Sequence, residues 1–278
     1  MMRLLGIVIL FHPSREVLEN IDSYISGVDT LLVWSNSILS KEFLQDLKTR
    51  PVLLLGNQQN EGIGKALNEA VGYALNQDYT HLLTMDQDSS FEKSAFLTYR
   101  EEINLNKDSN IGCFTPNHGW NTIDPKTGTI KSTITSGSVY PVRIFHKTGL
   151  FRSDFFIDGI DTEFSLRLRN QGYSIHCVDS VRMNHHLGNS TQFHIGRFKF
   201  SSINYPPLRT YYILRNHTLI RKMYKEYREE KGFYKFFVFR RFIQIILLES
   251  DKRAKLKAMF WGLIHGYSGK TGICKVKL

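Results

Sequence analysis

Short, nearly all-apolar segments alternate with helix-like segments through the first 85 residues, and this alternation constrains the fold more than any other feature. The pattern predicts strands at residues 4–11, 30–33, 52–55 and 81–85. It predicts helices at about residues 13–26, 43–48 and 61–76. Apolar strands joined by helices indicate a parallel sheet covered on both faces. In such sheets ligands bind beyond the carboxyl ends of the strands.

The remainder of the chain changes character. We expect strands at residues 111–115, 134–140, 155–157 and 174–183, and a helix at residues 162–171. From residue 197 the pattern is helical, basic and aromatic. Residues 1–196 carry 17 Lys/Arg and 21 Asp/Glu, whereas residues 197–278 carry 19 and 5. We therefore predict a ligand-binding α/β domain over residues 1–196 and a basic helical region over residues 197–278.

The three cysteines and the N-terminal segment bear on the cellular compartment. Cys113, Cys177 and Cys274 are far apart and odd in number. They suggest no disulfide framework and no metal site, and they fit a reducing compartment. The apolar N-terminus runs into Pro13 without a small-residue cleavage site, which favours a first strand over a signal peptide. No run of 18 uncharged apolar residues exists, so we expect no transmembrane helix.

Two carboxylates, Asp86 and Asp88, follow the fourth apolar segment directly. If the chain stays extended, these side chains share a face while Gln87 points away. Hard oxygen ligands at a strand end suit Mg²⁺ or Mn²⁺, and such an ion suits a ligand that carries phosphates. The alternative is a strand that ends in an acidic, solvated turn.

A glycine-containing loop precedes the helix expected at residues 61–76. Gly62 and Gly64 at the helix start let the backbone approach a ligand, and a helix N-terminus favours anions. The alternative is ordinary helix capping after a polar loop. The spacing is not that of a P-loop.

Three acids, Asp158, Asp161 and Glu163, lie close together at the start of another expected helix. One of them can serve as a general base if its surroundings raise its pKa, or as a simple N-cap. His185 falls at a strand end, where a neutral imidazole can complete a metal site. A histidine in that position can equally be structural.

Together these motifs resemble a family 2 glycosyltransferase of the GT-A fold, and most of all the bacterial rhamnosyltransferases. The matching motifs are Pro13, Asn60-x-Gly62 with Asn68, Asp86-x-Asp88, Thr135-Ser-Gly137, Asp161-x-Glu163 with Arg167, Gly172-Tyr173 and His185-x-x-Gly188. The closest matches are residues 82–89, residues 156–173 and Tyr211-Tyr212-x-x-Arg215-Asn216. The resemblance covers roughly residues 4–270.

The resemblance implies a mixed, mostly parallel Rossmann-like sheet flanked by helices, with a basic helical C-terminal extension. It implies a nucleoside diphosphate sugar as donor, with dTDP-L-rhamnose favoured over other UDP- or dTDP-sugars. Asp88 would hold a Mn²⁺ or Mg²⁺ ion, Asp86 would support the metal or contact the donor ribose, and His185 would contact the metal or diphosphate. Further donor-binding residues would be Pro13, Asn36, Asn60, Gly62, Lys65, Asn68 and Gln87.

The resemblance also implies that Asp161 removes the proton of the acceptor hydroxyl in a direct displacement with inversion. The acceptor side of the cleft would hold Ser136, Gly137, Asp158, Glu163 and Arg167. Three departures from the family pattern stand out. Ser35 occupies the place of an Asp that helps to hold the nucleobase, Ile160 replaces the first acid of a Glu-Asp pair, and the Q-x-x-R-W signature of processive relatives is absent.

The strongly apolar segment at residues 233–248 carries cations at Lys235, Arg240 and Arg241. A basic amphipathic helix of this type can lie on an anionic membrane, or it can pack on the catalytic domain. Its Phe and Ile content disfavours nucleic acid as a partner. A lipid-linked glycan acceptor and a cytoplasmic, peripheral place on the inner face of the cell membrane would follow. A non-catalytic nucleotide-sugar-binding or nucleic-acid-binding protein is the alternative from another class.

Overall fold

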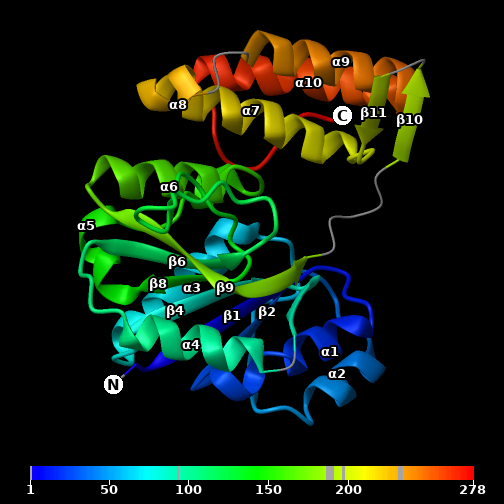
Figure 1. The fold of residues 1–278 in the computed structure, drawn as a ribbon. Coiled ribbons are helices and arrows are strands. Elements are labelled where there is room, and N and C mark those ends of the chain that lie inside the picture. The colour runs from blue at the N-terminus through cyan, green and yellow to red at the C-terminus, as the bar shows by residue number, and fades with distance from the viewer. Residues whose placement is uncertain (1, 93, 186–190, 196–197, 231–233) are drawn as a thin grey trace. The chain divides into compact units, whose positions relative to one another are not determined.

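The computed structural model describes residues 2–92, 94–185, 191–195, 198–230 and 234–278 (Figure 1). The chain forms two compact units. The first consists of Met1–Ser153 and Asp161–His186, and the second of Asp154–Ile160 and Leu187–Leu278. The short segment Asp154–Ile160 thus belongs with a part of the chain that lies far along the sequence. The expected boundary at residues 196 and 197 lies outside the described residues.

The first half of the first unit is a parallel sheet, as the alternating pattern predicted. Its strands are β1 (Leu4–Leu10), β2 (Thr30–Ser35), β3 (Val52–Leu55) and β4 (His81–Asp86). They lie in the order β3-β2-β1-β4 and all pair in parallel. Their carboxyl ends therefore meet at one edge of the sheet, where a ligand is expected.

The sheet continues beyond β4 as a mixed sheet. Its further strands are β8 (Ser138–Pro141), β6 (Ile111–Asn117), β9 (Ser174–His185), β5 (Ser89–Phe91) and β7 (Thr129–Ile130). β8 pairs antiparallel with β4 and β6, and β6 pairs in parallel with β9. β5 and β7 both pair antiparallel with β9. The expected mixed, mostly parallel sheet is confirmed.

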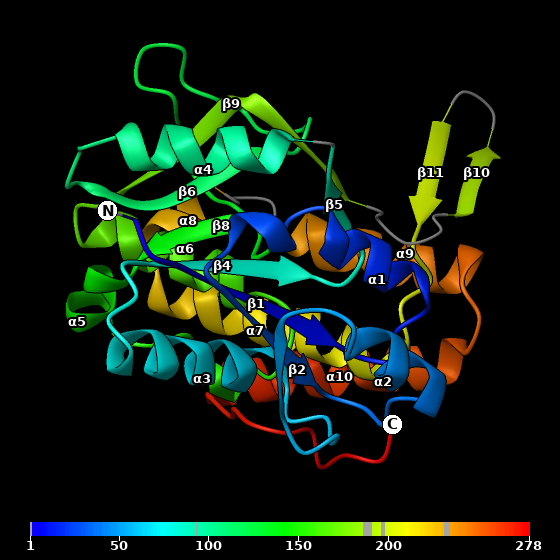
Figure 2. The ribbon, with the colours of Figure 1, turned by 90° about the horizontal axis from the view of Figure 1, so that it is seen from below.

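Helices cover the sheet of the first unit on both sides. They are α1 (Glu16–Asp22), α2 (Lys41–Leu47), α3 (Ile63–Asn76), α4 (Ala95–Leu105), α5 (Phe145–Thr148) and α6 (Ile160–Asn170). Figure 2 shows α3 and α4 on opposite sides of β1 and β4. Leu4 and Val8 of β1 pack in one core with Phe96 and Tyr99 of α4. Because side chains alternate along a strand, Leu5 and Ile7, which are also fully buried, face the other side.

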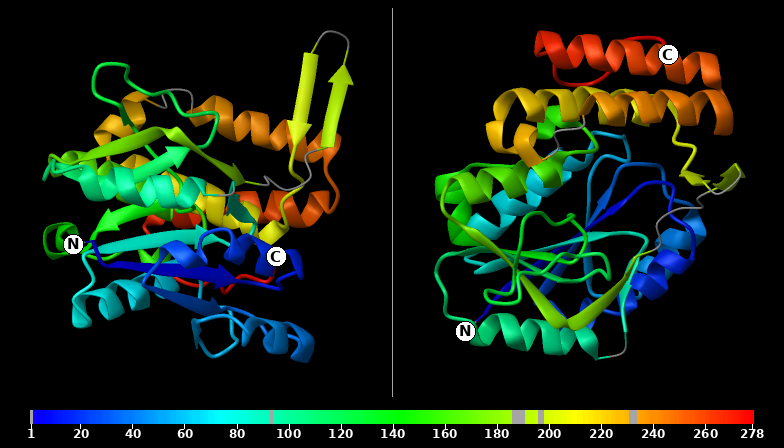
Figure 3. Two further views of the ribbon diagram at one scale, coloured as in Figure 1. Left: turned by 60° about the horizontal axis from the view of Figure 1, so that its bottom comes forward. Right: turned by 45° about the horizontal axis from the view of Figure 1, so that its top comes forward.

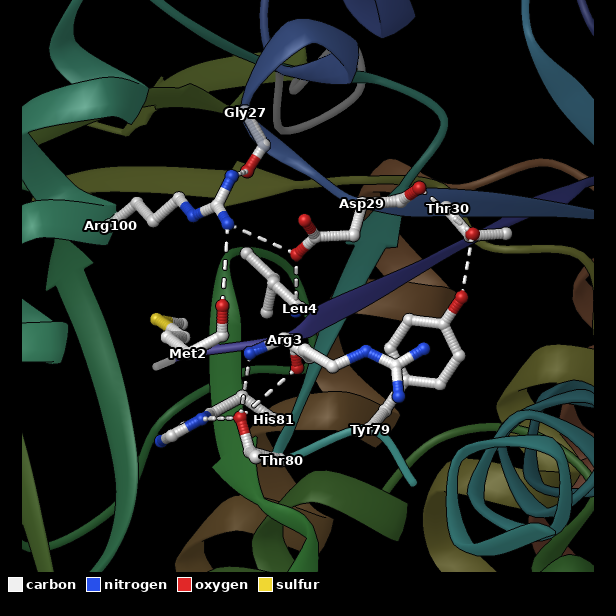
Figure 4. Close-up of polar contacts among 10 residues, drawn as sticks. All are labelled: Met2, Arg3, Leu4, Gly27, Asp29, Thr30, Tyr79, Thr80, His81 and Arg100. Atoms are coloured by element: carbon white, nitrogen blue, oxygen red, sulfur yellow. Dashed lines mark hydrogen bonds and ion pairs between the residues drawn. The ribbon is translucent and has the colours of Figure 1, made fainter. Parts of the chain in front are cut away.

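A polar network fastens the amino ends of these strands (Figure 4). The Asp29 carboxylate accepts hydrogen bonds from the Leu4 amide (2.7 Å) and from the Arg100 guanidinium (3.0 Å). Arg100 also donates to the Gly27 carbonyl (2.9 Å). The Tyr79 hydroxyl contacts the Thr30 hydroxyl at 2.6 Å. These contacts join α4 to β1 and β2 at the edge of the sheet opposite the expected ligand.

Several expected elements differ in the structure. The helix expected at residues 13–26 is split into α1 and the 3₁₀ turn Ile25–Gly27, and the strand expected at residues 134–140 begins only at Ser138. Residues 155–157 form no strand, since Phe156 has a φ of 66° that extended backbone does not allow. Helix α4 was not expected. Neither was the antiparallel pair of β10 (Thr191–Ile195) and β11 (Phe198–Ser202) in the second unit (Figure 3).

The rest of the second unit is helical. It contains α7 (Pro207–Met223), α8 (Lys225–Glu230), α9 (Tyr234–Leu248) and α10 (Lys252–Ser268). α7 and α10 pack along one another (Figure 1). A Cβ at Gly266 would lie 2.5 Å from the Thr218 Cβ, so glycine permits this close approach. No described helix is long and apolar enough to cross a membrane.

Candidate active site

Side-chain hydrogen bonds tie the carboxyl ends of β1, β2 and β4 together. Gln87, directly after β4, accepts from the Phe11 amide (2.8 Å) and donates to the Phe11 carbonyl (3.1 Å). The His12 amide donates to the Ser37 hydroxyl (2.7 Å), and the Asn20 amide group donates to the Gln87 carbonyl (2.9 Å). The loop that contains Pro13 is thereby fixed beside the turn that contains the two acids.

Asp86 and Asp88 do not continue the strand together. β4 ends at Asp86, and Gln87 and Asp88 form a turn before β5. The extended chain on which the expected shared face depends is therefore absent at Gln87 and Asp88, and the strand ends in a turn, which was the alternative. Asp86 is half-buried and accepts from the Thr135 hydroxyl (3.3 Å), whereas Asp88 is exposed.

Ser136 and Gly137 lie beside the end of β4. The Asp86 amide donates to the Ser136 hydroxyl (3.2 Å), and the Gly137 amide donates to the Thr84 carbonyl (2.9 Å). Gly137 has a φ of 75°, and a Cβ there would lie 2.8 Å from the Met183 sulfur. Glycine is required at this turn, which places Ser136 against the Asp86 backbone.

The glycine loop meets the end of β2 through Asn36. The buried Asn36 side chain accepts from the Trp34 indole (3.0 Å) and the Glu61 amide (3.3 Å), and it donates to the Gly62 carbonyl (3.4 Å). Gly62, with a φ of 84°, precedes the first turn of α3. Asn36 thus positions the loop, and its hydrogen-bonding groups are used inside the protein.

The other residues of this loop divide between the surface and the interior. Asn60 is exposed and accepts from the Gly62 amide (3.1 Å). Lys65 forms an ion pair with Glu61 one turn earlier. The Asn68 amide exchanges two hydrogen bonds with the Phe151 backbone, at 2.9 and 3.0 Å. Asn68 therefore anchors the backbone at Phe151. This placement adds no support to the assignment of Asn68 to donor binding.

Asp161 stands in the first turn of α6. Its Oδ1 accepts from the Thr162 amide (2.7 Å), which orients the carboxylate. Burial raises the pKa of Tyr140 in β8, and the charges of Cys113 and Asp161 contribute to this shift. Tyr140 pairs with Leu82, near the amino end of β4.

Glu163 and Arg167 form a buried pair on α6. The Glu163 side chain is 2% exposed, and both of its oxygens accept from the Arg167 guanidinium. Arg167 also donates to the carbonyls of Thr148 (3.0 Å) and Leu150 (2.6 Å). These contacts fix the turn after α5, and the assignment of the pair to the acceptor side of the cleft stays a prediction.

Asp158 lies in the second unit and pairs with Arg209 of α7 at 3.1 Å. Burial raises the pKa of Asp158, and the Arg209 guanidinium opposes this rise. Two further residues of α7, Arg215 and Asn216, are fully buried and bind backbone carbonyls of the same segment. The sequence singled out Arg215 and Asn216 as a motif but assigned them no role, and it gave no signal for Arg209.

A divalent cation fits the residues at the end of β4 in chemical type. Mg²⁺ and Mn²⁺ commonly bind one or two carboxylates together with substrate phosphates and water, and Asp86 and Asp88 supply such carboxylates. Among the described side chains, no group of three or more His, Cys, Asp or Glu is arranged to hold a metal. The backbone of His185 pairs with Ser89 near this turn, but its side chain lies outside the described part of the chain.

Comparison with known proteins supports the resemblance found in the sequence. No protein-family model matches the chain. The dTDP-rhamnosyl transferase RfbF of Shigella flexneri is 34% identical over 91 residues, which span 32% of this chain and 29% of that protein.

Solved glycosyltransferase structures share the fold over nearly the whole chain. GalNAc-T7 with UDP, GalNAc and Mn²⁺ matches 96% of this chain and 57% of its own, with a TM-score of 0.61 and 13% identity. Staphylococcus aureus TarS with UDP-GlcNAc matches 95% and 81%, with a TM-score of 0.58 and 12% identity. The mannosyltransferase PcManGT of Pyrobaculum calidifontis, with GDP-Man and Mn²⁺, matches 96% and 88%, with a TM-score of 0.56 and 11% identity. The chain has the GT-A fold of these enzymes and resembles family 2 glycosyltransferases.

Proposed function

We propose that this protein is an inverting glycosyltransferase that moves L-rhamnose from dTDP-L-rhamnose to a lipid-linked glycan in bacterial cell-surface polysaccharide synthesis. One observation carries the proposal: the ends of β1, β2 and β4 are joined by hydrogen bonds into one edge that presents Asp86, Asp88 and the Gly62 loop. The GT-A fold and the match to a dTDP-rhamnosyl transferase support the reaction class.

In the proposed reaction, the Asp161 carboxylate accepts the proton of the acceptor hydroxyl. The hydroxyl oxygen bonds to the anomeric carbon as the bond from that carbon to the diphosphate oxygen breaks, which inverts the anomeric configuration. A positioned general base typically contributes about 10²- to 10⁴-fold in rate. A divalent cation held by Asp88 and Asp86 would offset the charge on the departing nucleoside diphosphate.

The donor identity is tested by measuring ligand-induced thermal stabilisation with Mn²⁺ across dTDP-L-rhamnose, UDP-GlcNAc and GDP-Man. A ligand that binds only the folded state raises the apparent stability. We expect the largest rise with dTDP-L-rhamnose. A larger rise with a UDP-sugar would favour the same reaction with that donor, which is the second candidate. Binding without any transfer to polyprenyl-diphosphate-linked glycans would instead indicate a non-catalytic nucleotide-sugar-binding protein.

We also propose that the second unit attaches the protein to the inner face of the cell membrane. α9 has an exposed apolar stripe, with Phe239, Phe242 and Leu247 at 59%, 41% and 56% exposure, and Arg240 exposed beside it. The opposite face of α9 packs through Ile245 in the core of the unit. An exposed apolar stripe beside a cation suits an anionic lipid surface, and packing alone does not require it. Arg241, expected as another cation of this surface, is instead buried in an ion pair with Glu249.

Co-sedimentation with vesicles tests this attachment. The protein should sediment with phosphatidylglycerol vesicles at low salt, less so at high salt, and less so after Phe239→Gln and Phe242→Gln. Leu97→Gln and Leu105→Gln on α4, which replace exposed leucines of the first unit, are the matched control and should have no effect. An absence of sedimentation at low salt would leave α9 with its packing role alone.

A further inference from the structure

The segment Asp154–Ile160 runs from the 3₁₀ turn Ser153–Phe155 to the first residue of α6, and residues 156–159 between them are irregular backbone that packs against α7. Two of its residues, Phe156 and Asp158, have positive φ values of 66° and 62°, and Gly159 follows with 77°. Buried carbonyls without partners are costly, so donors must come from elsewhere in the chain. Backbone amides supply two of them: Gly272 donates to the Asp154 carbonyl (2.7 Å) and Ile157 to the Phe155 carbonyl (2.8 Å). Side chains of α7 supply further donors.

Asn216 of α7 supplies the donors at the centre of the segment. Its side-chain nitrogen lies 3.0 Å from the Phe155 carbonyl, 2.8 Å from that of Ile157 and 2.7 Å from that of Asp158. Asn216 is fully buried. The side-chain amide of Asn216 therefore binds three backbone carbonyls, and the backbone curves around it.

Arg215 binds both the side-chain amide of Asn216 and the carbonyls at the start of the segment Asp154–Ile160. Its Nε donates to the Asn216 side-chain oxygen (2.8 Å), which fixes the amide with its nitrogen toward the carbonyls. Its Nη2 donates to the carbonyls of Phe155 (2.8 Å) and Asp154 (3.2 Å). The guanidinium lies over the rings of Tyr211 and Tyr212, at 5.5 and 4.7 Å.

Further contacts within the second unit pack the segment Asp154–Ile160 against α7. The Phe156 ring stacks on Tyr212, with centroids 5.0 Å apart. A Cβ at Gly159 would come within 3.2 Å of Ile220 of α7, so the backbone there lies directly against the helix. Arg215 and Asn216 of the motif thus bind the backbone of residues 154–158, while Arg215 also donates to the Gly272 carbonyl and the Tyr212 hydroxyl accepts from the Cys274 amide (2.8 Å).

That backbone leads directly into α6, which begins at Ile160, and Asp161 follows in the first turn of the helix. We propose that Arg215 and Asn216 are positioning residues for the reaction: by binding the carbonyls of Asp154–Asp158, they fix the conformation from which the chain enters α6 and presents the Asp161 carboxylate. The proposal rests on the proposed function of Asp161 as the general base.

The substitution Asn216→Asp tests this role, because it keeps the shape of the side chain and replaces the donors with an oxygen that repels the carbonyls. We expect kcat for transfer from dTDP-L-rhamnose to fall at least about tenfold, with the Kd for dTDP within about twofold of wild type. The pH dependence of kcat should also shift, since the base is held differently. Arg215→Lys, which retains the charge but not the forked donor geometry, should act in the same direction.

The matched control is Ile245→Ala on α9. Ile245 is fully buried in the second unit and packs with Leu214 and Met259, away from the segment. This variant should lower the thermal stability of the protein while leaving kcat and its pH profile unchanged at a temperature where the protein is folded. Equal loss of kcat in Ile245→Ala and Asn216→Asp would overturn the proposal in favour of general destabilisation.

A double-mutant cycle separates this proposal from the proposed function. If Asn216 acts through Asp161, then Asn216→Asp should cause no further loss of kcat in an Asp161→Asn background. A full additional loss there would overturn the positioning role and leave Asp161 as the base. Unchanged turnover in Asp161→Asn alone would overturn the proposed base itself, and with it the role of Asn216.

Discussion

Gln87 and Phe11 exchange two hydrogen bonds across the ends of β4 and β1, at 2.8 and 3.1 Å. The middle residue of the Asp86–Asp88 motif is thus used to join two strands. This contact bends the chain after Asp86 and separates the environments of the two acids. Gln87 therefore has a structural role, since its side chain shapes the turn on which Asp88 stands, and its assignment to donor binding stays a prediction.

The Gln87 contact should be measurable as stability. Gln87→Ala removes both hydrogen bonds and should lower the free energy of unfolding in urea by about 1 kcal/mol, because each such bond contributes about 0.5–1.5 kcal/mol before solvent exposure is considered. Gln87→Glu keeps the accepting oxygen and should lose less. An Ala variant as stable as wild type would contradict the structural role.

Asp88 should control the metal dependence of nucleotide binding. Asp88→Asn should weaken Mn²⁺-dependent binding of dTDP at least about tenfold, or about 1.4 kcal/mol, measured by titration calorimetry. Asp108→Asn is a control, because Asp108 lies near the amino end of the sheet and its contact with the Asn110 amide tolerates the change. Wild-type affinity that persists in a chelator would show that the carboxylate holds no metal.

The buried pair on α6 should matter for stability. Glu163→Gln leaves the Arg167 guanidinium largely buried without its counter-charge and should cost about 3–5 kcal/mol. The double change Glu163→Met and Arg167→Met should cost less, since no charge is stranded. Glu229→Gln breaks an exposed pair with Lys225 of the same spacing and should cost under about 1 kcal/mol. Equal effects of Glu163→Gln and Glu229→Gln would contradict the structural assignment.

His81 should make stability depend on pH. Burial lowers its pKa to about 4, and the cations Arg143 and Lys107 add to this effect. The folded state therefore disfavours the protonated ring. At pH 7 this costs nothing, but as the pH falls below about 6.5 the unfolded chain takes up the proton first and the folded state loses stability.

For wild type we expect a loss of about 1 kcal/mol from this group between pH 7 and pH 5, a figure reduced for its partial exposure. His81→Gln should show a correspondingly smaller decrease in unfolding free energy over the same interval. His146→Gln, which replaces an exposed histidine, is the control. An identical pH dependence in wild type and His81→Gln would show that this ring does not contribute.

The sequence predicted what depends on local pattern and missed what depends on distant side chains. Strands β3 and β4 were predicted because their apolar runs are short and bounded by polar residues. The turn at Gln87 stayed one of two alternatives in the sequence, because a contact to Phe11, 76 residues away, decides it. Residues 155–157 looked like an aromatic strand, yet Arg215 and Asn216 hold them in an irregular conformation.

In the candidate site, too, local sequence pattern predicted some features, and contacts made in the folded chain decide the others. Asp86 and Gly62 were expected near one another, since strand ends of a parallel sheet share an edge, whereas Ser136 was assigned to the cleft through the resemblance. In the structure the Asp86 amide donates to the Ser136 hydroxyl, and Asn36 at the end of β2 donates to the Gly62 carbonyl. Glu163 was grouped with Asp161 because the two are close in sequence. On α6, however, Glu163 turns inward to Arg167, which only the packing of the helix determines.

The most direct measurement is the turnover of Asp161→Asn with dTDP-L-rhamnose and a polyprenyl-diphosphate-linked glycan, beside the Kd for dTDP. The account predicts a loss of kcat of about 10²- to 10⁴-fold with nucleotide affinity within about twofold of wild type, because the amide cannot accept the acceptor proton. Wild-type turnover in Asp161→Asn would contradict the assignment of this residue as the base.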